Sequence, residues 1–202
     1  MRARGFLPLV LAMGFVIAAV APRSAAADQS ARAFMQGVSN RVLDILNEKQ
    51  RPDAEREKQF ETLVDQNFDL PRIARFVLGL SWRTASAEEK QEFNQAFRTY
   101  LIDFYWGRFR QYSGQSFKVI GEQAQSSTLT IVNTQIVQPS GQPPAKVDWT
   151  LLKEGDGYKI IDVSIEGISQ VLTYRQEFAA VIQRNDGHVS ALIDAINKKI
   201  KG

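Results

Sequence analysis

The chain has 202 residues, with 25 Lys and Arg against 22 Asp and Glu, one His and no Cys. Its 44% of hydrophobic residues is typical of a globular protein and excludes a disordered or repetitive chain. The absence of Cys excludes disulfides, thiolate metal sites, a cysteine nucleophile and a lipidated N-terminal cysteine. A single His also excludes a multi-histidine zinc site.

The first 27 residues have the pattern of a cleaved secretory signal. Arg2 and Arg4 precede an apolar run over residues 6–20, and small residues occupy the positions around Ala25 and Ala27. Cleavage after Ala27 would leave residues 28–202, which carry no repeat or long linker and are predicted to form a single domain. The alternative is an uncleaved anchor, but the apolar run is short for a span of about 20 residues.

Removal of this segment changes the charge balance. It takes away Arg2, Arg4 and Arg23 and no acid, so the remaining chain carries 22 basic and 22 acidic residues. The basic character therefore belongs to the signal segment, and no overall positive field favours nucleic acid as a partner.

Helical periodicity and start signals predict six helices, at about 30–49, 53–66, 69–80, 87–112, 169–185 and 188–199. The clearest start is a capping box in which Ser86 is the N-cap and Glu89 is three residues further on. The helix that follows is apolar around much of its circumference, so it must be covered on several sides or line an internal space.

Four segments rich in β-branched and aromatic residues predict strands at 116–121, 128–138, 146–154 and 158–167. A three-residue loop over 155–157 would join the last two as a hairpin. Its register places these pairs on one apolar face: Leu151 with Ile161, Trp149 with Val163, and Val147 with Ile165. The opposite face then carries Asp148, Thr150, Asp162 and Ser164. The fold class is α+β, with a four-stranded antiparallel sheet packed against six to seven helices.

Catalytic candidates are few. Asp162, Ser164 and Glu166 alternate along one strand, and a buried carboxylate pair there could act as acid or base. The simpler interpretation is a solvated polar face or a cap for the following helix. His188 is interpreted as an exposed turn residue, and no nucleotide-binding, serine-hydrolase or metal-ligand motif is present.

Three blocks resemble the MlaC family of periplasmic phospholipid-binding proteins, also called toluene-tolerance proteins. They are residues 67–82 (NFDLPRIARFVLGLSW), residues 89–101 (EKQEFNQAFRTYL) and residues 160–178 (IIDVSIEGISQVLTYRQEF). The resemblance implies a fold related to nuclear-transport-factor and cystatin-like proteins, with a deep apolar pocket for acyl chains. It implies a soluble periplasmic carrier that needs no cofactor and binds phospholipid.

The same resemblance implies two partners, an inner-membrane ABC-type lipid transport complex and an outer-membrane lipoprotein–porin complex, and a role in outer-membrane lipid asymmetry. One branch of the family accompanies hopanoid biosynthesis, so a hopanoid-type lipid is an alternative cargo. An enzyme for small hydrophobic substrates, with Asp162 or Glu166 as its base, is a second hypothesis. An assembly protein with a filled core is a third.

The predicted lipid-binding residues lie on the aromatic helix, the apolar sheet face and the helix after the sheet. They are Phe97, Tyr100, Leu101, Phe104, Trp149, Leu151, Ile161, Val163, Ile165, Val171, Leu172 and Tyr174. No catalytic residue and no metal site are predicted, and Arg75, Glu166 and Arg175 are expected to be structural or to face a partner.

Overall fold

The computed structural model describes residues 30–201, so the predicted signal segment 1–27 lies outside the described residues. Seven helices and one five-stranded sheet follow one another along this part of the chain. The helices are α1 (Ala31–Asn47), α2 (Asp53–Asn67), α3 (Leu70–Leu78), α4 (Ser81–Thr84), α5 (Ala87–Phe109), α6 (Gln170–Arg184) and α7 (Val189–Lys201). The strands are β1 (Ser116–Ala124), β2 (Leu129–Val137), β3 (Ala145–Glu154), β4 (Gly157–Ile165) and β5 (Ile168–Ser169).

The predicted helix starts are confirmed by their caps. Ser86 Oγ accepts a hydrogen bond from the Glu89 amide at 3.0 Å, and the Glu89 carboxylate accepts one from the Ser86 amide at 2.9 Å. Asp69 caps α3 by accepting from the Arg72 amide at 3.0 Å. These side chains satisfy amides that the first helical turn leaves without a partner, and they fix where each helix begins.

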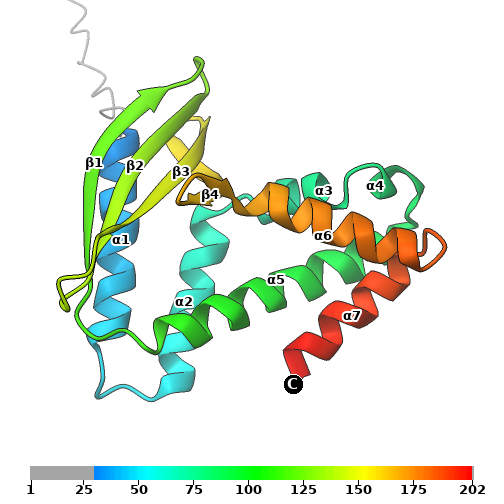
Figure 1. Ribbon diagram of the computed structural model, residues 1–202, viewed down its shortest axis with the longest axis horizontal. Helices are drawn as coiled ribbons and strands as arrows, with labels where there is room; N and C mark the ends of the chain where they lie inside the picture. The colour runs from blue at the N-terminus through cyan, green and yellow to red at the C-terminus, as the bar shows by residue number, and fades with distance from the viewer. Residues whose placement is uncertain (1–29, 202) are drawn as a thin grey trace, which may run out of the picture.

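The sheet is an antiparallel meander in the order β1-β2-β3-β4-β5. The fold class is confirmed, although the predicted four strands become five because Ile168 and Ser169 pair with the end of β4. In Figure 1 the sheet curves over α1, while α3, α4, α6 and α7 lie on the other side of the molecule. Helix α5 runs between the two parts.

The predicted register of the β3–β4 hairpin is correct at one end and wrong at the other. Trp149 pairs with Val163 as predicted, but Leu151 pairs with Ile160 rather than Ile161. The register shifts between Thr150 and Leu151, and the loop contains only residues 155 and 156 because Glu154 pairs with Gly157. A bulge of this kind inserts one residue, which moves every later side chain to the other face. Ile160 is therefore fully buried in place of Ile161.

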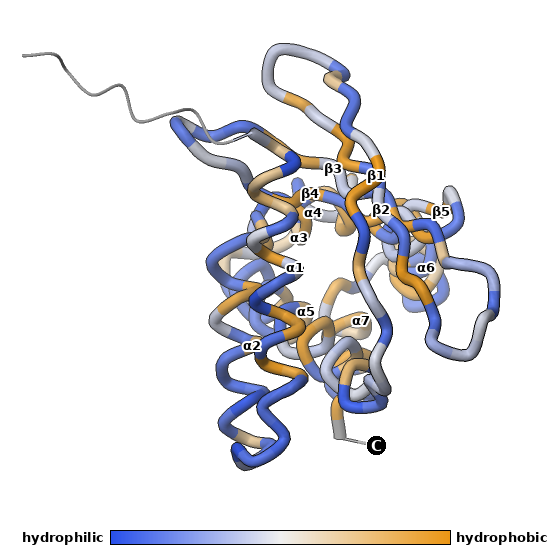
Figure 2. The backbone as a smooth tube through the Cα atoms, turned by 90° about the vertical axis from the view of Figure 1, so that its left-hand side faces the viewer, coloured by the Kyte–Doolittle hydropathy of each residue, from blue (hydrophilic) through white to orange (hydrophobic). Residues whose placement is uncertain are grey.

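Two apolar cores hold these elements together. We call the first the helical core; its fully buried members include Phe93, Phe97, Val77 and Leu192. We call the second the sheet core; it joins α1, α2 and the second half of α5 to the strands, and its fully buried members are Met35, Val132, Leu151 and Ile160. Helix α5 contributes to both cores, which explains why its sequence is apolar on more than one side. In Figure 2, α2 is hydrophilic over most of its length, as its largely exposed outer surface requires.

Candidate functional site

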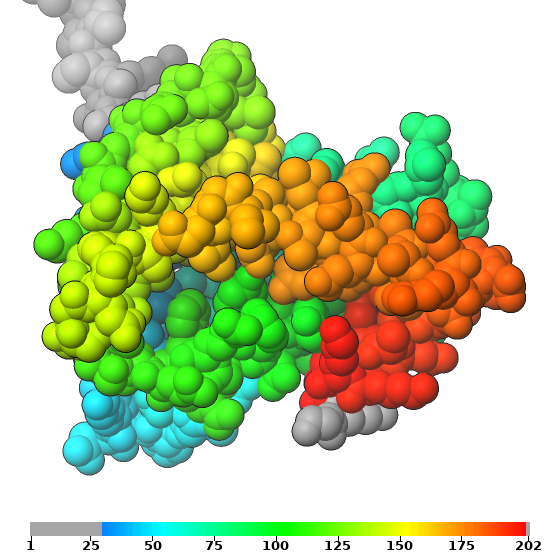
Figure 3. Space-filling view, in the orientation of Figure 1, coloured from blue at the N-terminus to red at the C-terminus, as the bar shows by residue number. Residues whose placement is uncertain are grey.

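An apolar cavity of about 130 Å³ lies where the two cores meet. Figure 3 shows a hollow between the strands, α5 and α6, with atoms of α1 visible at its base. The surface that faces the cavity is almost entirely carbon. Its walls come from α1, α2, α3, α5, α6 and the β3–β4 hairpin: Val38, Val42, Phe60, Leu63, Val64, Phe68, Leu70, Ile73, Phe97, Leu101, Tyr105, Phe109, Trp149, Asp162, Val163, Gln170, Val171 and Tyr174.

The link between α2 and α3 brings several of these residues under the sheet. Phe68 forms a parallel bridge with Ile160, and the Asp69 amide donates to the Ile160 carbonyl oxygen at 3.0 Å. Leu70 and Ile73 follow within the first turn of α3 and face the same space. Backbone pairing to the sheet thus fixes the position of a wall that is otherwise helical.

Trp149 forms part of the sheet wall, and its indole is held by hydrogen bonds. Its Nε1–H donates to Thr134 Oγ1 at 3.0 Å, and the Thr134 hydroxyl donates to the Val147 carbonyl oxygen at 2.6 Å. Thr134 is fully buried, so this chain satisfies a polar group that would otherwise be costly in an apolar interior. The Trp149 ring is therefore fixed while its apolar face lines the cavity.

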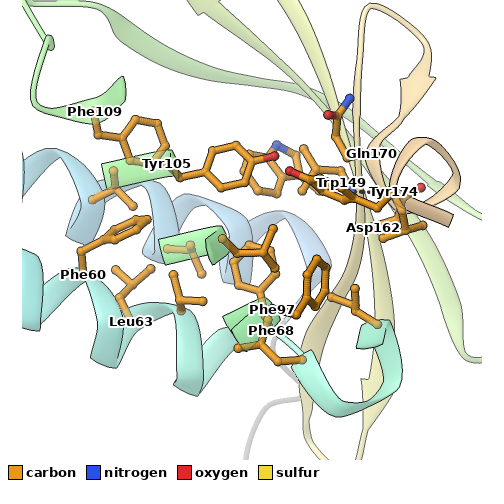
Figure 4. A pocket seen from close by; sticks show the side chains of 18 residues that line it. Phe60, Leu63, Phe68, Phe97, Tyr105, Phe109, Trp149, Asp162, Gln170 and Tyr174 are labelled. Atoms are coloured by element: carbon orange, nitrogen blue, oxygen red, sulfur yellow. Dashed lines mark hydrogen bonds between the residues drawn. The ribbon is translucent and has the colours of Figure 1, made fainter. Parts of the chain in front are cut away.

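Two tyrosines place their hydroxyls at one side of the cavity. Figure 4 shows the Tyr105 and Tyr174 side chains converging, with Gln170 beside them. Burial is the main cause that raises the pKa of both phenols, and for Tyr174 the nearby Tyr105 raises it further. Both rings therefore stay neutral at physiological pH.

Among the residues that the structure describes, Asp162 is the one carboxylate on the cavity wall, and both of its oxygens accept hydrogen bonds. They accept from the Val163 amide at 2.7 Å, the Ser169 hydroxyl at 2.6 Å and the Val171 amide at 3.2 Å. Ser169 is the N-cap of α6, so Asp162 joins the end of β4 to the start of that helix. A carboxylate at a helix N-terminus is also favoured by the helix dipole. Strand alternation predicts that Asp162 lies on the polar face of the sheet. In the structure α6 folds over the end of β4, so Asp162 becomes part of the cavity wall.

The other polar candidates lie away from the cavity. The Glu166 carboxylate accepts from the Lys146 amide at 2.7 Å, and its backbone has a positive φ of 49° in the turn after β4. Ser164 pairs with Asp148 and Ser169 within the sheet. His188 is an exposed turn residue at the start of α7. Within residues 30–201, no group of three or more potential ligands could hold a metal ion.

Half of the predicted lining residues face the cavity: Phe97, Leu101, Trp149, Val163, Val171 and Tyr174. Tyr100 and Phe104 instead stack on each other at 5.9 Å on the next face of α5, and Leu151 is fully buried in the sheet core. Ile161 is the extra residue of the β-bulge, between the paired Ile160 and Asp162, and it does not face the cavity. Ile165 and Leu172 are 38% and 49% exposed, because they lie at the outer side of the turn between β4 and α6.

Comparison with known proteins identifies a family that matches most of the chain. Residues 36–198 match the family described as MlaC protein. The chain belongs to the MlaC family. It is 24% identical over 184 residues to toluene tolerance protein ttg2D of Pseudomonas putida, covering 89% of this chain and 85% of that one. The family predicted from the three sequence blocks is therefore confirmed.

A solved structure shares the fold. It is a phospholipid-binding protein from Ralstonia solanacearum in complex with a phospholipid, and it matches with a TM-score of 0.74 and 24% identity. The match covers 85% of this chain and 97% of that one.

In this MlaC-family chain, sequence reasoning missed the walls formed by α1, α2 and α3. The spacing of Val38 and Val42 on α1, and of Phe60, Leu63 and Val64 on α2, identifies apolar helix faces. Periodicity shows that such a face is covered but not what lies opposite, so it could not separate core residues from cavity residues. Within residues 30–201, none of the helices is both long and apolar enough to span a bilayer.

Proposed function

We propose that this chain is a periplasmic lipid carrier that encloses phospholipid acyl chains in the cavity between its two cores. The observation that carries the proposal is an apolar cavity at the junction of two otherwise well-packed cores. Membership of the MlaC family and the shared fold of a protein that holds a phospholipid support it. A filled interior would have favoured an assembly protein instead.

The hydrophobic effect explains why a lipid needs such a carrier to cross water. Each methylene that leaves water is stabilised by about 0.8 kcal/mol, so a two-chain lipid needs roughly 20 kcal/mol or more of shielding to cross an aqueous space. The neutral tyrosines and the hydrogen-bonded Asp162 leave the cavity without a free charge that would oppose an acyl chain. A headgroup that stays in water needs no dedicated phosphate site.

The cavity must widen to take a lipid. Its volume of about 130 Å³ is close to that of an engineered cavity of about 150 Å³ that accepts benzene, whereas ligand pockets usually measure about 300–1,000 Å³. By this measure the cavity is smaller than most ligand pockets, and the hollow in Figure 3 opens to solvent. Uptake would move the β3–β4 hairpin away from α5, because both line the cavity, whereas α2 is tied to α5 by the ion pairs of Arg98 with Glu61 and Asp65.

We assign lipid contact to the six predicted residues that face the cavity and extend it to the walls formed by α1, α2 and α3. Phe60, Leu63 and Ile73 are the strongest additions, because each is buried in one core and also faces the cavity. Cleavage after Ala27 would release residues 28–202 into the periplasm as a single lipid-binding domain. An inner-membrane ABC-type complex and an outer-membrane lipoprotein–porin complex would then exchange lipid with it and maintain lipid asymmetry.

The enzyme hypothesis is disfavoured by the contacts of its two candidate bases. Asp162 accepts three hydrogen bonds, two of them from backbone amides, and Glu166 accepts one from the Lys146 amide. Both carboxylates thus hold the turn between β4 and α6, and no second carboxylate faces Asp162 across the cavity within the described part of the chain. We infer that the chain acts as a carrier without a catalytic step or a cofactor.

The test is the lipid content of protein purified from cells. An organic extract analysed by mass spectrometry should contain phospholipid in a fixed ratio to protein, and Asp162→Asn should keep that lipid. Extraction of a hopanoid instead would assign the cargo to that branch of the family. Protein that carries no lipid and also takes up none from phospholipid vesicles would contradict the proposal.

A further inference from the structure

A second concavity, of about 370 Å³, lies on the far side of α3 and α6 from the lipid cavity. We call it the arginine groove, because every charged residue that lines it is an arginine. Its lining is Arg72, Arg75, Phe76, Gly79, Leu80, Trp82, Arg83 and Arg175. The proposed carrier function does not use this surface.

The groove has an excess of positive charge. Arg72 pairs with Asp69 at 2.7 Å and approaches Glu154 at 4.0 Å. Arg75 and Arg83 are exposed, and in the part of the chain that the structure describes no carboxylate lies within ion-pair distance of either. The overall charge of residues 28–202 is balanced, so this local imbalance is a property of the groove itself.

Arg175 is placed in the groove by the end of α3. Its Nη1–H donates to the Phe76 carbonyl oxygen at 2.9 Å, and its guanidinium lies 4.8 Å from the centroid of the Phe76 ring. Gly79 has a positive φ of 58°, and a Cβ there would lie 3.1 Å from Arg175 Nη2. The glycine therefore both ends α3 and makes room for the guanidinium.

Apolar side chains flank these arginines. Leu80 is 74% exposed and Phe76 is 41% exposed, at the junction of α3 and α4. Figure 1 shows this junction at the edge of the molecule, on the side away from β1 and β2. An exposed leucine that projects beside unpaired arginines matches the side chains that enter the interface of a bilayer while cations contact lipid phosphates.

We propose that the arginine groove docks the protein on an anionic phospholipid bilayer. The arginine forks suit phosphate oxygens, and Leu80 with Phe76 would insert among the headgroups. An acidic protein segment would also satisfy the arginines, but it gives no reason for Leu80 to project into solvent. The inference goes beyond the proposed function, since a carrier that meets only protein complexes needs no bilayer contact of its own.

The groove and the lipid cavity use opposite faces of the same helices. On α3, Leu70 and Ile73 face the cavity while Arg72 and Phe76 face the groove. On α6, Tyr174 faces the cavity and Arg175 the groove. Substitutions at exposed groove residues should therefore leave bound lipid unchanged, which separates a failure of docking from a failure of the carrier function.

The experiment is sedimentation of the protein, as processed and purified from cells, with vesicles of two compositions. One is phosphatidylcholine alone, and the other is phosphatidylcholine with an equal part of phosphatidylglycerol. The unsubstituted protein should bind the anionic vesicles at least about tenfold more strongly and lose this preference at about 1 M salt, where the Debye length is about 3 Å.

The double variant Arg75→Glu with Arg83→Glu should weaken binding to anionic vesicles by at least about tenfold, since each basic residue near such a surface contributes about fivefold. Leu80→Ser should weaken it by about threefold to tenfold. Arg32→Glu makes the same kind of charge change at an exposed residue of α1 and should bind as the unsubstituted protein does. All of these variants should retain lipid on extraction.

The proposal fails if the double variant sediments like the unsubstituted protein, or if both vesicle types bind equally. It also fails if a soluble glutamate-rich peptide binds the groove while anionic vesicles do not, because the groove would then serve an acidic protein partner.

Discussion

The helical core and the apolar cavity contain the same kinds of side chain, yet the core is filled and the cavity is not. In the helical core Phe93 stacks on Phe97 at 5.5 Å, and Phe178 meets both rings edge-on at 5.9 and 5.6 Å. A few residues further along α5, Leu101 and Tyr105 face open space. Close packing of α3, α5, α6 and α7 brings their side chains into contact. The curved sheet lies apart from α5, although α2 still packs on that helix through Phe60 and Trp106. The open space therefore follows from how the elements diverge and not from composition.

A charge on the cavity wall should have the largest effect. Val163→Arg places an arginine in the apolar space, at a cost of several kcal/mol, and should abolish folding or lipid retention. The neighbouring Ser164→Arg is the control, because its side chain lies opposite Asp148 in the sheet and can pair with it. Circular dichroism and lipid extraction would compare the two variants. Equal damage from both would show that the face assignment is wrong.

Removal of the same side chain from the two regions should give different losses of stability. Leu192→Ala opens a void in the filled helical core, where Leu192 is 1% exposed, and should lower the free energy of unfolding by about 3–5 kcal/mol. Leu101→Ala enlarges a cavity that already exists and should cost about 1–2 kcal/mol. Urea denaturation of lipid-free protein measures both. A larger loss for Leu101→Ala would mean that the cavity is packed in solution.

Alkaline pH should lower the free energy of unfolding, because Tyr105 and Tyr174 are buried beside the cavity. The pKa of Tyr105 and of Tyr174 is raised in the folded protein, so the unfolded chain loses these protons first, from its ordinary pKa of about 10. Stability is then fully present below about pH 10 and falls by up to about 1.4 kcal/mol per pH unit for each tyrosine above it. Urea midpoints at rising pH would show the decline. Tyr174→Phe should reduce the slope of this decline, because it removes one of the two buried phenols.

A substitution that fills the cavity should lower the lipid content with the smallest change in stability. Val171→Phe places an aromatic ring in the empty space of the cavity. The free energy of unfolding should therefore change by less than about 1 kcal/mol. Bound lipid should fall severalfold, as measured by extraction and mass spectrometry. Val181→Phe makes the same exchange on α6 where the side chain packs on the filled helical core, and it should destabilise the protein while leaving lipid in place. The reverse pattern would move the lipid site to the helical core.

Local chemistry in the sequence is sufficient for most of the architecture. Ser86 with Glu89, and Asp69 before Pro71, mark helix starts because their side chains satisfy backbone amides at short range. Alternation along β3 and β4 predicts the correct pairing of Trp149 with Val163. These helix starts and this pairing depend on residues that are close in the sequence, so the sequence alone predicts them.

The errors arise where the outcome depends on contacts made far along the chain. Ile160 and Ile161 carry the same side chain, so alternation gives no signal of the bulge that turns Ile160 inward. Strand β5 has two residues, too few for any periodicity. Ile165 and Leu172 are expected in the pocket because they are apolar, but the turn between β4 and α6 leaves them outside. The cavity walls from α1 and α2 could not be assigned from the sequence, because periodicity does not show what lies opposite an apolar helix face.

The central claim is that the space between the two cores holds lipid, and native mass spectrometry of the processed protein tests it directly. The account predicts a complex heavier than the protein by the mass of a phospholipid, and loss of that extra mass in Val171→Phe while the fold persists. A single species at the mass of the protein alone, before and after incubation with phospholipid vesicles, would contradict it.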